Sequence, residues 1–299
     1  MFSCLLHVSE DAVSLYIQAI VNGILIGGVY SLMAVGLSLI FGVMRVINFA
    51  HGDMMVWGMY LSLWLFTTLG VDPYLSVLFT GAAVFMLGAA IQRGLVNRIL
   101  TAPHEMQILL MMGVGLVLEN LSLMTWGPDP RRVDVSYGLT TFWIGPIVVD
   151  LPRLVTFALA LVLALCLYLF LVRTDLGRMI RAASDNQTGA LLVGTDIRKV
   201  FTLAFGVGAA CVGAAGSLMT PLLPFTPSSG LLFTVTSFNI VIIGGMGNLL
   251  GAFVGGLLVG VSESLGAVVL VPSLKEIVGF VLLVLILLFR PQGLMGGRR

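Results

Sequence analysis

Charged residues are scarce in this sequence, and their scarcity excludes a soluble protein. Lys, Arg, Asp and Glu make up 10% of the 299 residues, hydrophobic residues make up 59%, and the mean hydropathy is +1.09. Soluble domains carry about 25% charged residues, which cover the surface that faces water. The composition therefore predicts that lipid surrounds most of the chain. The net charge of +1 gives no indication of a nucleic-acid partner.

Lysine, cysteine and histidine are also rare, which limits the chemistry that the chain can carry. Neither lysine, Lys199 or Lys275, follows a glycine, so the Gly-Lys-Ser/Thr end of a phosphate-binding P-loop is absent. The cysteines have no metal-binding or redox spacing, and His51 with Asp53 has no further metal ligands nearby. We therefore expect no metal, no cofactor and no enzymatic activity. Any ATP hydrolysis must come from another subunit.

Long apolar runs fill most of the chain. A helix needs about 20 apolar residues to cross a bilayer, so these runs predict an all-α, polytopic bundle of about eight to nine transmembrane helices. The longest polar segments, 127–152 and 173–199, are too short to bury cores of their own, so residues 1–299 should form a single domain. The expected spans cover residues 15–41, 50–69, 73–92, 105–126, 153–172, 200–219, 231–244, 249–270 and 275–290.

Basic residues cluster between the apolar runs and predict the topology. Cytoplasmic loops carry an excess of Lys and Arg. If all three clusters face the cytoplasm, the N-terminus lies outside and two crossings fit within 231–270. The alternative for residues 231–270 is a single crossing with a re-entrant piece. The clusters comprise Arg93 and Arg98; Arg173, Arg178, Arg181, Arg198 and Lys199; and Arg290, Arg298 and Arg299.

The cytoplasmic loop at 173–199 has the pattern of a short amphipathic helix. Thr174 or Asp175 can cap its start, and Gly194 can end a second short turn. Held between two spans, such a helix can transmit a push from a soluble partner. The alternative is an ordinary loop on the lipid headgroups, whose arginines serve only topology.

A polar segment follows the first span. Asn48, His51 and Asp53 place polar side chains beside an apolar block, and Gly52 lets the helix break there. Polar groups at membrane depth are costly and usually line a cavity or pair with one another. The segment is therefore a candidate for the translocation pathway, although it also fits a connector at headgroup level.

Glycines interrupt or line several of the expected spans. The repeats Gly23/Gly27 and Gly256/Gly260 predict stripes on which another helix packs closely. The run from Gly244 to Asn248 breaks an apolar block and should lie at an interface or cavity. Of two acids within spans, Glu119 is the better functional candidate, and Glu263 fits a snorkelling role near a span end. The predicted pathway residues are Asn48, His51, Asp53, Glu119, Gly244, Gly245, Gly247 and Asn248.

Taken together, these motifs resemble the permeases of branched-chain amino acid ATP-binding-cassette (ABC) importers over nearly the whole chain. The resemblance rests on F-G-V-M-R-V-I-N-F-A-H-G-D at 41–53, G-G-M-G-N-L-L-G at 244–251, F-R-P-Q-G-L-M-G at 289–296, and the loop at 173–199. Thr195 departs from the isoleucine that is more common there. The resemblance implies that the loop is the ATPase-coupling element, through Gly177, Arg181, Ala182, Ala190 and Gly194.

The family also implies the partners. A second permease subunit, identical or a longer paralogue, would pair with this chain in the bacterial inner membrane. Two ABC ATPase subunits would dock on the inner loops, and a periplasmic binding protein would deliver the substrate. Related urea or amide permeases are an alternative, although Phe49 favours amino acids because urea permeases tend to carry Met there. An ion-coupled secondary transporter is the rival from another class.

Overall fold

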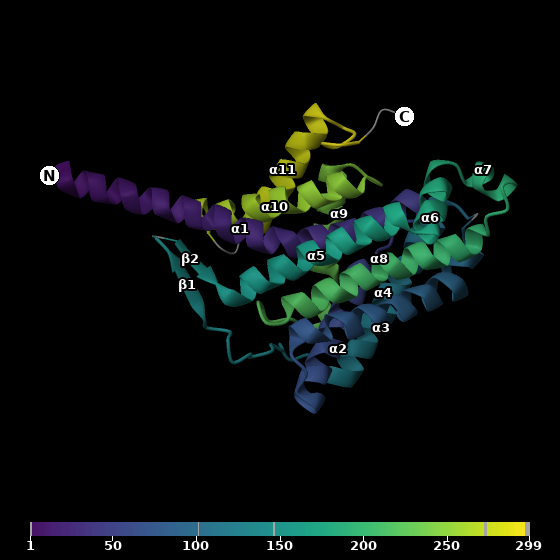
Figure 1. The fold of residues 1–299 in the computed structure, drawn as a ribbon, viewed down its shortest axis with the longest axis horizontal. Coiled ribbons are helices and arrows are strands. Elements are labelled where there is room, and N and C mark those ends of the chain that lie inside the picture. Colours follow the sequence, from purple (N-terminus) through teal and green to yellow (C-terminus); the bar gives the residue numbers. More distant parts are fainter. Residues whose placement is uncertain (1, 101, 146, 272–273, 297–299) are drawn as a thin grey trace.

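The computed structural model describes residues 2–100, 102–145, 147–271 and 274–296, so Arg298 and Arg299 lie outside the described residues. Within those ranges the chain forms eleven α-helices, two 3₁₀ turns and one β-hairpin (Figure 1). The elements are α1 (Phe2–Met44), α2 (His51–Leu69), α3 (Pro73–Gly94), η1 (Val96–Arg98), α4 (His104–Trp126), β1 (Thr141–Ile144), β2 (Ile147–Asp150), α5 (Leu151–Arg173), α6 (Asp175–Asp185), α7 (Gln187–Leu192), α8 (Ile197–Met219), η2 (Pro227–Ser229), α9 (Gly230–Gly244), α10 (Leu249–Val269) and α11 (Lys275–Phe289).

The structure confirms the helical class, with two differences from the prediction. Seven helical segments of the described chain are long and apolar enough to cross a membrane, rather than eight or nine. α2 is not among them, because its 19 residues include His51 and Asp53, and α11 has only 15 residues. The second difference is the antiparallel hairpin β1–β2 in the loop between α4 and α5, which helix-length patterns do not detect.

α1 is the centre of the bundle. It runs between α10 on one side and α5 and α8 on the other (Figure 1). The predicted glycine stripes form its contact with α10: a β-carbon on Gly260 would lie 2.5 Å from the carbonyl oxygen of Gly23, and one on Gly256 would lie 2.4 Å from the backbone nitrogen of Ser31. The Ser31 hydroxyl donates to the carbonyl of Phe253 at 2.7 Å, across the same contact. Only glycine permits this approach, as the stripes predict.

The connecting segments gather at two ends of the bundle. At the end marked by the hairpin in Figure 1, Gln18 of α1 exchanges two hydrogen bonds with Val148, and Tyr137 donates to Asp72 at 2.5 Å. At the opposite end, near α6 and α7, Ser184 donates to the carbonyl of Gly42 at 2.8 Å. The hairpin end holds loops that the charge pattern assigns to the outside, and the opposite end holds those assigned to the cytoplasm.

Candidate translocation site and coupling surface

Two helices start within the bundle rather than at its ends. After α1, Arg45 with a φ of 55° turns the chain back, and His51 at the start of α2 reaches the carbonyl of Met33 with its Nε2 at 3.1 Å. Met33 lies eleven residues before the end of α1, which is about 16 Å along the helix. α2 therefore begins deep in the bundle, not at headgroup level.

The start of α9 meets the start of α2 at this depth. The Gly52 amide donates to the Thr234 hydroxyl at 2.9 Å, and that hydroxyl donates to the carbonyl of Phe49 at 3.1 Å. A β-carbon on Gly52 would lie 2.0 Å from the carbonyl oxygen of Gly230. The two helix N-termini, with their partial positive charges, therefore point into one small region.

The predicted polar residues Asn48 and His51 lie next to this region in the chain and carry unpaired atoms. Both side chains are fully buried. Since the carbonyl of Met33 can only accept, Nε2 of His51 carries the proton, and its Nδ1 is a buried acceptor without a partner among the described residues. Nδ2 of Asn48 is likewise an unpaired donor, while its Oδ1 accepts from the Ala50 amide at 3.1 Å. An unpaired buried polar atom costs about 1–3 kcal/mol, so a role beyond packing is expected here.

Asp53 places a carboxylate between three helices. It is 8% exposed, and β-carbons on Gly230 of α9 and Gly115 of α4 would collide with its two carboxylate oxygens. Glu119 follows Gly115 by one turn of α4, so it lies on the same helix face, partly exposed. The structure therefore brings Asn48, His51, Asp53 and Glu119 into one neighbourhood.

The Gly244–Asn248 break lies elsewhere. Gly247 packs on Gly42 at the cytoplasm-assigned end of α1, and the Asn248 side chain accepts from the Gly251 amide at 2.9 Å and donates to the carbonyl of Met295 at 2.7 Å. Gly245, with a φ of 106°, is covered by the C-terminal tail. Because the break and the Asp53 region lie at opposite ends of the 15-residue α9, about 21 Å separates them.

Gly230 and Thr234 are therefore site residues that sequence reasoning missed. Their signal was present in T-P-S-S-G at 226–230, in which Thr226 begins a capping box and Pro227 stands at the first position of a turn that leads into an apolar run. The pattern marks a helix start, but nothing in it indicates depth in the membrane.

The loop at 173–199 forms two short helices that are tied to α1 and α5. Thr174 caps α6 by accepting from the Gly177 amide at 3.0 Å, as predicted. Gly177 packs on α5, where a β-carbon would lie 2.4 Å from the carbonyl oxygen of Phe170, and Ala190 is buried. Arg181 and Ala182 are exposed, so they face away from the bundle.

The tip of this loop exposes a run of apolar side chains. Leu191, Leu192 and Val193 are 58%, 84% and 80% exposed, and Gly194 follows with a φ of 86°. Asp196 then caps α8, and the amide and side chain of Lys199 lower the pKa of its carboxyl, so it stays ionised at neutral pH. Large apolar side chains that project from a polar loop are typical of a protein contact.

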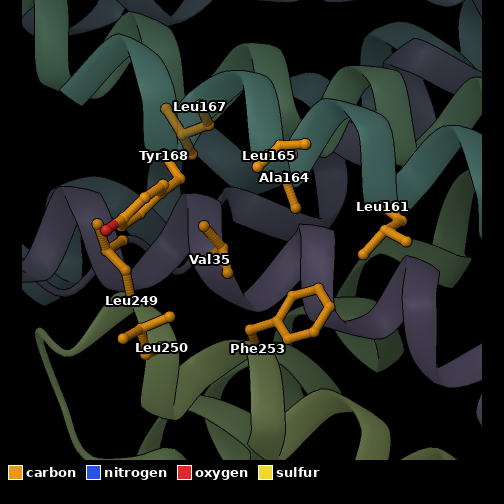
Figure 2. A pocket seen from close by; sticks show the side chains of 9 residues that line it. All are labelled: Val35, Leu161, Ala164, Leu165, Leu167, Tyr168, Leu249, Leu250 and Phe253. Atoms are coloured by element: carbon orange, nitrogen blue, oxygen red, sulfur yellow. The ribbon is translucent and has the colours of Figure 1, made fainter. Parts of the chain in front are cut away.

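The pocket in Figure 2 has a different character. About 220 Å³ lies between α1, α5 and α10, where Leu161 and Phe253 face one another and Tyr168 supplies the one side-chain polar group of the lining. Such a surface suits an acyl chain, not a zwitterion, because a zwitterion would lose its hydration without gaining partners. The apolar pocket therefore carries no substrate site.

Comparisons with known proteins identify the family of the chain. The family model described as "Branched-chain amino acid transport system / permease component" matches residues 19–287. The chain is similar to the high-affinity branched-chain amino acid transport system permease proteins BraD of Pseudomonas aeruginosa and LivH of Escherichia coli K12, at 28% identity for each, over 94% of this chain and 96% of the relative. A shorter match, 31% over 46% of this chain and 32% of the relative, is to the E. coli permease protein LivM. No solved structure matches the chain.

Proposed function

We propose that this chain, which belongs to the permease components of branched-chain amino acid transport systems, moves branched-chain or related amino acids across the bacterial inner membrane with energy from a separate ATPase. It is a multi-pass membrane protein of a transport family, not an enzyme. The observation that supports ATPase coupling is the exposed apolar tip at Leu191–Val193, on the same loop as exposed Arg181. An ion-coupled transporter has no use for such a surface.

The partners follow from the same surface and from the relatives. A second permease related to LivM pairs with this chain, since LivM and LivH are both permeases of one named transport system and both are similar to it. Two ABC ATPase subunits dock on the inner loops of the pair, and a periplasmic binding protein delivers the amino acid at the hairpin end. No nucleic acid takes part.

We further propose nine crossings within one domain, 1–299. α2 and α11 complete the count, because each joins the two ends of the bundle: the chain runs from the end with Gly42 through α2 to the end with Asp72, and α11 runs from Lys275 at the hairpin end toward Met295, which bonds Asn248 of the break. The N-terminus then lies outside and the loop at 173–199 lies in the cytoplasm.

The pathway in this proposal runs along α2, α4 and α9. At mid-depth Asn48, His51, Asp53 and Glu119 offer unpaired polar atoms and negative charge, which suit the ammonium and carboxylate of an amino acid. Nearer the cytoplasm, the break Gly244, Gly245, Gly247 and Asn248 is the inner gate, which the C-terminal tail holds in place through Asn248 and Met295.

Reconstitution tests the proposal. The chain, its partner permease and the ATPases in liposomes should take up radiolabelled leucine with binding protein outside and ATP inside. Arg181→Ala should lower this uptake about tenfold, as expected for a charge-assisted contact worth about 1.4 kcal/mol, with normal membrane insertion. Uptake driven by an ion gradient without ATPase would instead establish the secondary transporter, and preference for urea or amides would redirect the substrate class.

A further inference from the structure

A polar cavity of about 320 Å³ lies at the hairpin end of the bundle, apart from the pathway described above. α1 and α10 form its walls, and the first turns of α5 and α11 form its rim. Its volume is at the lower end of the range for small-molecule sites, about 300–1,000 Å³. Gln18, which lines it, is bonded at both ends of its amide to Val148, so the hairpin lies at its mouth.

A buried carboxylate forms the floor of this cavity. Glu263 is 6% exposed, and the Tyr30 hydroxyl donates to its Oε2 at 3.0 Å. Its Oε1 has no hydrogen-bond donor among the residues that the structure describes. Asn22 lines the same cavity with a buried, unpaired Oδ1. A snorkelling role for Glu263 is therefore wrong, and both groups can accept from a donor within the cavity.

Two cations stand at the rim. Arg153 pairs with Asp150 at 3.1 Å, whereas Lys275 makes no direct ion pair within the described part of the chain. The cavity thus has acceptors at its floor and a cation above them. An intramembrane carboxylate costs about 3 kcal/mol on insertion scales, and one hydroxyl offsets only part of that cost.

We propose that this cavity binds a zwitterion with a primary ammonium group, its ammonium on Glu263 and Asn22 and its acidic group at Lys275. A free amino acid and an aminophospholipid headgroup share this chemistry. We favour the amino acid, which would wait here between delivery outside and the deeper pathway; that choice rests on the proposed function.

Competition binding on the full-length chain in detergent tests the assignment. Tritiated leucine is the probe, with 4-methylpentanoate, which lacks the ammonium, and 3-methylbutylamine, which lacks the carboxylate, as competitors. Leucine should bind about tenfold or more tightly than either analogue. In the Glu263→Gln variant, which keeps an acceptor for Tyr30, leucine should bind no more tightly than 4-methylpentanoate. In the Lys275→Gln variant, leucine should bind no more tightly than 3-methylbutylamine. A merely structural role would weaken all three ligands alike.

A matched control and a lipid arm complete the test. Glu105→Gln removes an exposed carboxylate from the first turn of α4 and should change none of these affinities. Native mass spectrometry then compares retained phosphatidylethanolamine with phosphatidylcholine, whose headgroup has no N–H. Glu263-dependent retention of the former without leucine binding would support the zwitterion site and assign it to lipid. If neither ligand depends on Glu263 while ATP-driven uptake persists, the site is overturned and the proposed function stands.

Discussion

The exposed tip of the coupling loop gives the sharpest prediction. Leu192 and Val193 are 84% and 80% exposed, so nearly all of each side chain is available for burial in a partner. Burying such a side chain contributes about 1.5–3 kcal/mol. With the lower value for each residue, the double substitution Leu192→Ser and Val193→Ser should cost about 3 kcal/mol of docking energy, or about 100-fold in the Kd for the ATPase.

Biolayer interferometry on the detergent-solubilised permease measures this Kd directly. Thermal unfolding of the variant without ATPase should match the parent, because substitutions of exposed residues shift stability by about 0.5 kcal/mol or less. Leu139→Ser is the matched control: this leucine is 94% exposed in the loop that leads to the hairpin, so it should leave ATPase affinity unchanged.

A double variant that binds the ATPase as tightly as the parent does would exclude the tip as the docking surface. Equal weakening by Leu139→Ser would exclude it too, because the loss of affinity would then reflect exposed apolar area in general. A drop in the unfolding temperature of the isolated permease would show that the tip packs within the chain.

Further predictions concern packing, capping and the pathway. Gly256→Val should destabilise the fold by about 1–3 kcal/mol and so lower the unfolding temperature, because its β-carbon meets the backbone of α1. Gly113→Val is the control: it has open space around it and should leave the unfolding temperature unchanged. Asn248→Ala loses a helix cap worth about 1 kcal/mol and its bond to the tail, so limited proteolysis should remove the tail faster; an unchanged rate would contradict this. Asp53→Asn should reduce ATP-driven uptake about tenfold or more, with normal insertion, and full uptake would exclude Asp53 from the pathway.

Features that depend on neighbouring residues along the chain could be predicted well. The apolar runs specify most helices, because twenty apolar residues in lipid satisfy their backbone only as a helix. Thr174 as a cap and the Gly256/Gly260 stripe were also predictable from local sequence. A helix cap bonds an amide three residues further along the chain, and a glycine stripe repeats every four residues. The hairpin at 141–150 was not predicted, because strands of four residues are too short to produce a recognisable alternation of polar and apolar residues.

The candidate site could be predicted only in part. Asn48, His51 and Asp53 were found because polar residues stand out in an apolar chain. The structure separates these residues from the Gly244–Asn248 break by the length of α9, because the direction of α9 decides which of its ends lies beside Asp53, and no local pattern encodes that direction.

The sequence by itself determined that this chain crosses a membrane many times, hydrolyses no ATP through a P-loop, and carries a polar break after its first long helix. Those facts follow from composition and short-range pattern, because every segment that crosses the bilayer must satisfy its own backbone hydrogen bonds. Only the tertiary structure decided that Gly230 meets Asp53, that Tyr30 bonds Glu263, and that this second pair lines a polar cavity at the hairpin end. Such contacts depend on how glycine surfaces let helices approach, and that is a property of pairs of helices rather than of any one of them.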